Sequence, residues 1–195
     1  MNFKRNNLIF AVTLGVCMLF GNANANANAN AKDKEGVDIE FNVTVPKNTC
    51  DILVEGTSQN VIDFGSIALA RLKSDSAEGK VKLPFSIKLA ECKNNDFANN
   101  YITLDGNYVV ENNGFLDDPG ERTFAIRISD KETATQADDV FFDKNKNKIW
   151  TNIQENVMEK QFYAYLMCKN GVKDCASDAN IGQFKSTFTL TYMVD

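Results

Sequence analysis

The stretch from Gln183 to Asp195 alternates apolar and polar side chains, which is the two-residue period of a half-buried β-strand. The sequence ends at Asp195, one residue after the last apolar position of this run, so no further strand is expected to follow it. In a β-sandwich, this last strand is therefore expected to have no neighbour from its own chain. Proteins normally cover an unpaired strand edge, and a strand from a second chain is one way to cover it. The apolar positions are Phe184, Phe188, Leu190, Tyr192 and Val194.

Similar short runs recur along the chain with polar breaks between them. No window of a dozen residues repeats its apolar positions at the 3.6-residue period of a helix, although residues 130–139 suit either a helical turn or a loop. Many short strands joined by turn-rich segments predict an all-β fold, an immunoglobulin-like β-sandwich. The expected strands cover residues 37–45, 61–67, 81–89, 101–104, 108–110, 124–128, 140–142, 162–167 and 183–194.

The first 25 residues have the pattern of a secretory signal peptide. Lys4 and Arg5 precede an apolar run, and Ala-x-Ala sites follow it. Residues 26–36 are rich in Asn, Ala and charge, lack core-forming side chains, and are expected to be flexible. Cleavage after residue 25 leaves 19 basic and 26 acidic residues, a net charge of about −7, which argues against nucleic acid or an anionic membrane surface as a partner. No later segment is apolar enough to span a membrane.

Four cysteines remain after the signal peptide, and an even number in an exported chain indicates disulfides. Three pairings are possible, and we favour Cys50–Cys92 with Cys168–Cys175. The second pair closes a short loop that contains Asn-Gly, a sequence suited to a tight turn. Zinc is disfavoured because the chain has no histidine and neither spacing is Cys-x-x-Cys.

Catalysis and cofactor binding find little support. Without histidine, the usual general base and the Ser/His or Cys/His nucleophile pairs are absent. Asp143–Asn147 resembles the start of a calcium loop, but Lys148 stands where an EF-hand needs Gly, and Gln154 stands where it needs Glu. Trp150 and nearby aromatic residues suit a sugar-stacking surface or a sandwich core, and burial is the commoner outcome. We therefore expect neither an enzyme nor a cofactor.

Three motifs resemble the pilin subunits of the bacterial chaperone–usher pathway, particularly those of K99-like fimbriae. Cys50 comes eleven residues after the start of Ile39–Asn42. Phe85–Leu89 alternates apolar residues and leads to Cys92, as does the family's strand that bears its second cysteine. Gly182–Tyr192 is similar to the family's closing strand. The match extends over most of the chain that follows the signal peptide.

The resemblance implies an immunoglobulin-like sandwich that lacks its last strand and is completed by donor-strand complementation. A periplasmic chaperone would lend a strand, and at the outer-membrane usher the N-terminal extension of a neighbouring subunit would replace it. Residues 1–25 would be the signal peptide, 26–36 the flexible segment, 37–47 the donor-type extension and 48–195 the pilin domain. The acceptor groove would include Phe184, Phe188, Leu190, Tyr192 and Val194, and the donor strand would present Val37, Ile39, Phe41, Val43 and Val45.

One position departs from the family pattern. Val43 lies seven residues before Cys50, where pilins of this class carry Gly, and a β-branched side chain there needs a roomier groove. This favours a minor structural subunit of a fimbria that is exported through the periplasm to the cell surface and supports adhesion. The alternative is a tip adhesin that binds a host glycan or protein receptor through polar loops. A secreted β-sandwich enzyme is the third hypothesis, which the missing histidine disfavours.

Overall fold

The computed structural model describes residues 36–44, 50–93, 97, 99–109, 114–117, 122–169, 175 and 182–194. The predicted signal peptide (1–25) and nearly all of the predicted flexible segment (26–36) lie outside the described residues, as do residues 45–49. Within the described part of the chain, no helix is long and apolar enough to cross a membrane.

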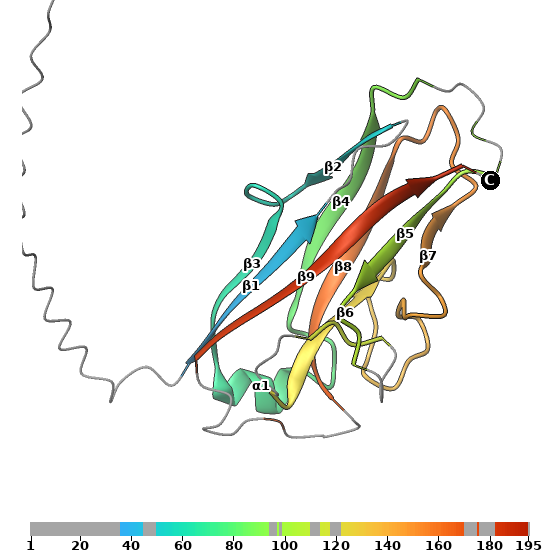
Figure 1. Cartoon of the computed structure of the whole chain (residues 1–195). Helices are drawn as coiled ribbons and strands as arrows, with labels where there is room; N and C mark the ends of the chain where they lie inside the picture. Colours follow the sequence, from blue (N-terminus) through green and yellow to red (C-terminus); the bar gives the residue numbers. More distant parts are fainter. Residues whose placement is uncertain are drawn as a thin grey trace, which may run out of the picture. The chain divides into compact units, whose positions relative to one another are not determined.

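The described chain forms two β-sheets (Figure 1). The five-stranded sheet has the order β3 (Val61–Ala68), β1 (Gly36–Thr44), β9 (Gly182–Met193), β5 (Tyr101–Gly106) and β7 (Lys148–Thr151). The four-stranded sheet has the order β2 (Asp51–Glu55), β4 (Lys82–Ala90), β8 (Glu159–Cys168) and β6 (Phe124–Ser129). The expected all-β sandwich is confirmed.

Aromatic side chains from both sheets meet in the core. Phe188 of β9 lies 6.1 Å from Phe85 of β4, and Phe184 of β9 lies 5.2 Å from Phe124 of β6, measured between ring centroids. These contacts cross between the inner faces of the sheets, as expected for a sandwich whose inward-facing side chains interdigitate. Trp150 of β7 is 4% exposed, so it belongs to the core and is not part of a sugar-stacking surface.

Some elements differ from the sequence-based expectation. Helix α1 (Leu69–Asp75) and strand β2 were not expected, because each spans only five to seven residues and shows little periodicity. The predicted strand 108–110 is wrong at Tyr108, which forms only an isolated bridge with Leu116. Similarly, residues 140–142 contribute one bridge, between Phe141 and Ser129. Residues 130–139 form bends and turns and contain no helix.

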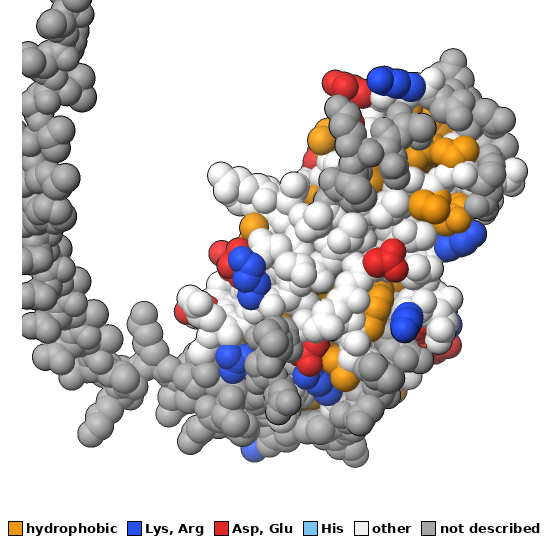
Figure 2. All heavy atoms as spheres, in the orientation of Figure 1, with side chains coloured by type: hydrophobic (Ala, Val, Ile, Leu, Met, Phe, Trp, Pro, Cys, Tyr) orange, Lys and Arg blue, Asp and Glu red, His pale blue; other side chains and the backbone are white. Residues whose placement is uncertain are grey.

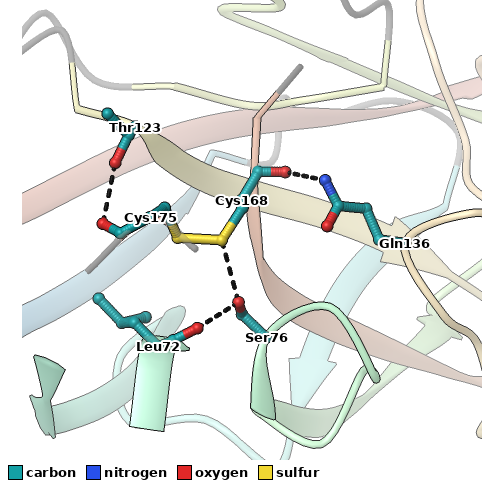
Figure 3. Close-up of a disulfide and its surroundings, with 6 residues drawn as sticks. All are labelled: Leu72, Ser76, Thr123, Gln136, Cys168 and Cys175. Atoms are coloured by element: carbon teal, nitrogen blue, oxygen red, sulfur yellow. Dashed lines mark hydrogen bonds between the residues drawn. A yellow bond between two sulfur atoms is a disulfide. The ribbon is translucent and has the colours of Figure 1, made fainter. Parts of the chain in front are cut away.

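Both favoured disulfides, Cys50–Cys92 and Cys168–Cys175, are present. Figure 3 shows the surroundings of the second, at the end of β8. The Ser76 hydroxyl, at the end of α1, donates to the Leu72 carbonyl and lies 3.1 Å from Cys168 Sγ. The Thr123 hydroxyl donates to the Cys175 carbonyl at 3.0 Å. The disulfide at the end of β8 therefore contacts the end of α1 through Ser76 and the segment that leads into β6 through Thr123.

Replacing Cys168 and Cys175 together with alanine is expected to lower the free energy of unfolding by about 2.5 kcal/mol, because the bond closes a short loop in the unfolded chain. Urea denaturation followed by circular dichroism would measure the loss. An unchanged denaturation midpoint would show that this bond adds nothing to stability.

Candidate strand-binding groove

The groove beside the terminal strand is filled by the chain's own N-terminal strand. β1 lies between β3 and β9 (Figure 1), pairing antiparallel with β3 and parallel with β9. The expectation that β9 has no neighbour from its own chain is therefore wrong. Residues 48–195 do lack this strand, however, and the segment that supplies it is the one predicted to be a donor strand. We call the space between β3 and β9 the β1 groove.

The inward side of β1 is apolar and closes the core. Ile39, Phe41 and Val43 are 1%, 0% and 6% exposed, and the Phe41 ring lies 4.6 Å from that of Phe188. Burying an Ile, Phe or Val side chain contributes about 1.5–3 kcal/mol. These three side chains together contribute about 5–9 kcal/mol on that scale. The side chain of Val37 and all of Val45, which were also predicted to face the groove, lie outside the described residues.

The outward side of β1 carries polar side chains. The Lys185 ammonium lies 3.4 Å from the Glu40 carboxylate, and the Ser66 hydroxyl donates to the Asp38 carboxylate. Figure 2 shows this face of the molecule, where polar surface and charged side chains predominate and hydrophobic side chains form small patches. The predicted alternation is thus confirmed at the described side chains of β1, with the apolar set turned inward.

A β-bulge in β3 adjusts its pairing with β1. Ile39 is opposite Gly65 and Glu40 is opposite Asp63, which leaves Phe64 as the extra residue. Gly65 has φ +60°, a left-handed conformation that glycine adopts without the cost of a Cβ. Its backbone N–H donates to the Asp63 carboxylate at 2.7 Å. The bulge was not predicted from the sequence, although bulges commonly carry such a glycine.

The predicted groove residues of β9 face inward, with one exception. Phe184, Phe188, Leu190 and Tyr192 are buried, whereas Val194 is 46% exposed. The prediction that Val194 lies in the groove is therefore wrong. Strand β9 ends at Met193, so the alternation of inward and outward side chains does not extend to Val194.

Tyr192 places its phenol next to an amide. The Asn100 side-chain amide donates to the Tyr192 oxygen at 2.5 Å. Burial raises the pKa of the Tyr192 phenol, and the bond from Asn100 partly opposes that rise. The phenol therefore remains neutral at physiological pH and accepts this hydrogen bond at the end of the core.

A polar residue also faces inward along β9. Ser186 is buried between Phe184 and Phe188, and its hydroxyl donates to the Asp117 carbonyl at 3.0 Å. The Asp117 carboxylate is paired with the Lys169 ammonium, and these side chains are only 11% and 9% exposed. Reasoning from alternation alone missed this group, because its partners come from distant parts of the sequence.

Val43 fits the β1 groove. It is opposite Phe188 in the parallel register, and Phe188 is opposite Gly106 of β5 on its other side. A Cβ at Gly106 would lie 2.6 Å from Leu116 Cδ2 and 2.9 Å from the Thr187 carbonyl oxygen. The glycine therefore lets β5, β9 and Leu116 approach closely at the level of Val43.

Replacing Gly106 with alanine is expected to lower the free energy of unfolding by about 1–3 kcal/mol, as overpacking does in other cores. Chemical denaturation would measure it. Because Leu116 is the nearest side chain, the loss in the double variant Gly106→Ala/Leu116→Ala should be smaller than the sum of the two single losses. Strict additivity would contradict this account of the close approach.

No metal-binding cluster of three or more His, Cys, Asp or Glu residues occurs in the part of the chain that the structure describes. Asp143 instead accepts backbone hydrogen bonds from Asn145 and Lys146, which orders the turn before β7. Around β1, by contrast, backbone ladders on both edges occur together with alternate buried apolar side chains, which are the features by which a sheet holds an added strand.

Comparisons with known proteins found similarity to a family model and to solved structures. A family model described as "Fimbrial protein" matches residues 39–191. The solved P pilus rod subunit PapA has a similar structure, with a TM-score of 0.51 and 16% identity over 75% of this chain and 91% of the PapA chain. At this identity, the second match concerns the fold. No curated protein sequence matches significantly.

Proposed function

This chain belongs to the fimbrial protein family, and on that premise we propose that it is a structural subunit that joins its neighbours by donor-strand exchange. The family is structural and not enzymatic, and its members are parts of cell-surface fimbriae. The finer points of the proposal are the donor role of β1, the acceptor role of the β1 groove, and export through the periplasm with a chaperone and an outer-membrane usher. The narrower likeness to K99-like fimbriae stays a prediction.

The seating of β1 between β3 and β9 is the observation that carries the proposal. The strand has a buried apolar side, a polar outer side and backbone partners on both edges. A strand from another chain with the same alternation would make the same kinds of contact. Such strand addition takes its affinity from main-chain hydrogen bonds and its specificity from pockets for alternate side chains.

Val43 does not require a minor position in the fimbria. Its β-branched side chain needs a roomier groove than glycine does, and it is buried in the groove of its own chain. A shaft position is therefore compatible with this residue. The tip-adhesin alternative has no observation in its favour among the described residues, so the structural role is the one we propose.

Labelling of surface fibres tests the proposal. An epitope-tagged chain, expressed in bacteria with its chaperone and usher, should appear along fibres in immunogold electron microscopy. Phe41→Asp should abolish its incorporation, because it places a charge on the inward side of β1, whereas Asn42→Ala on the outer side should leave incorporation intact. A tagged chain that accumulates as a free monomer and never enters fibres would contradict the proposal.

A further inference from the structure

We infer that residues 182–187, the first half of β9, leave their sheet together with β1 as one cooperative unit, and that contacts beyond the end of β5 limit how often this unit opens. These contacts are made by Asp117, Arg122, Lys169 and Ser186, which we call the β9 brace. The inference rests on the proposed function and concerns the regulation of the same groove.

The two halves of β9 have different neighbours in the sheet. Strand β1 pairs with residues 182–189 of β9, whereas β5 pairs only with residues 188–193 (Figure 1). Among the described strands, residues 182–187 therefore have a neighbour on one edge only. Ordering each of these residues costs conformational entropy, and a ladder on a single edge supplies fewer hydrogen bonds to offset that cost. Other contacts must help to hold this half of β9 in place.

The β9 brace supplies such contacts where β5 ends. The Arg122 guanidinium, in the segment that leads into β6, donates to the Gln183 carbonyl at 2.6 Å. The Ser186 hydroxyl donates to the Asp117 carbonyl at 3.0 Å. The Asp117 N–H in turn donates to the carbonyl of Asn107, the residue after β5, at 3.0 Å. Side chains thus satisfy polar groups beside β9 at the level where β5 no longer does so.

The β9 brace is anchored to the other sheet. The Asp117 carboxylate is paired with the ammonium of Lys169, the residue after β8, and the Lys169 N–H donates to the Thr123 carbonyl at 2.8 Å. Leu116, next to Asp117, exchanges two backbone hydrogen bonds with Ile126 of β6, at 2.7 and 3.0 Å. The first half of β9 is therefore held by β1 in its own sheet and by a brace that belongs to β6 and β8.

The two supports depend on each other. When β1 leaves, residues 182–187 lose their ladder, and the brace leaves them its two hydrogen bonds and the contact between the Phe184 and Phe124 rings, whose centroids are 5.2 Å apart. These contacts are few against the conformational entropy of the whole segment, so this half of β9 should open with β1. The brace then breaks as well, and its free energy is part of what opposes the opening of the groove.

Hydrogen exchange of the full mature chain, measured by mass spectrometry, tests this coupling. The double variant Arg122→Ala/Ser186→Ala removes both hydrogen bonds between the brace and β9. Peptides that cover β1 should then exchange at least about fivefold faster, because the loss of one hydrogen bond changes such an equilibrium about 2- to 12-fold. The single variant Arg122→Ala is the milder form, in which the same peptides should exchange about threefold faster.

Phe141→Leu is the matched control. Phe141 is 2% exposed and packs against Tyr165 of β8, with 5.4 Å between the ring centroids. Its truncation should destabilise the whole fold, so peptides from β4, which exchange on global unfolding, should exchange faster. Peptides that cover β1 should be unchanged in this variant, because the opening of β1 with the first half of β9 leaves Phe141 in its place.

Unchanged exchange of the β1 peptides in the double variant would overturn the inference, since β1 would then leave while the brace stays formed. An equal acceleration of β1 and β4 peptides in Phe141→Leu would also overturn it, since β1 would then open only with the whole fold. The measurement uses the monomer and no fibre. Failure of the tagged chain to enter surface fibres would therefore contradict the proposed function separately, whatever the exchange rates show.

Discussion

Deleting residues 36–44 is expected to leave a chain that no longer folds into a soluble monomer. The deletion removes the apolar side of β1, which contributes about 5–9 kcal/mol of burial, and it separates β3 from β9 in their sheet. The whole free energy of unfolding of a domain is about 5–15 kcal/mol, so the loss is of the same size. The exposed groove would also leave the edge of β9 unpaired, and such edges promote aggregation.

The measurement is the soluble fraction after periplasmic expression, with thermal unfolding of any protein that is recovered. A peptide of residues 36–44, or the same strand appended after Asp195 through a flexible linker, should restore a cooperative transition. The matched control deletes residues 26–35, which carry no core-forming side chains, and should unfold as the full mature chain does. A monomeric, cooperatively folded chain without residues 36–44 would refute the assigned role of β1.

This expectation differs from the one that the sequence gives. From the sequence, the mature chain is an incomplete sandwich that needs a second chain. In the structure, the full chain contains its own complementing strand, so it is expected to be folded before any exchange, and exchange must displace β1. The strand itself was predicted from its alternation at Ile39, Phe41 and Val43, but its partner was not, because periodicity reports a buried face and carries no information about which chain or which strand direction covers the edge.

The features that were predicted are those that local sequence determines, and the features that were missed depend on short segments or on contacts between distant residues. Local alternation was enough to identify β1, β4 and β9, apolar runs between polar breaks were enough to indicate β3 and β8, and the cysteine spacing was enough to favour both disulfides. Helix α1 and the bulge at Gly65 were missed because they depend on a few residues and on tertiary contacts. Ser186 and the pair Asp117–Lys169 were missed because residues 50 or more apart in the sequence form these contacts.

The Asp117–Lys169 pair is expected to give the second large effect on stability. Lys169→Met removes the ammonium group from beside the Asp117 carboxylate, in a site where both side chains are about nine-tenths buried. Removing one partner of a buried ion pair costs about 3–5 kcal/mol, because the remaining charge stays buried and loses the attraction of its partner. Asp117→Leu should have a loss of similar size, since it leaves the ammonium group in the same position.

A double-mutant cycle measures the interaction energy between Asp117 and Lys169 separately from their contacts with other residues. The double variant Asp117→Leu/Lys169→Met removes both charges, so its free energy of unfolding should recover most of the loss, with a coupling energy above about 2 kcal/mol. Lys185→Ala removes the partner of Glu40 in an exposed ion pair, in which the Lys185 and Glu40 side chains are 58% and 46% exposed. This substitution should lower the free energy of unfolding by less than about 1 kcal/mol. Equal losses at Lys169 and Lys185 would show that solvent screens both pairs alike. In that case the Asp117 segment would be held to β9 by the Ser186 hydrogen bond and not by its charge.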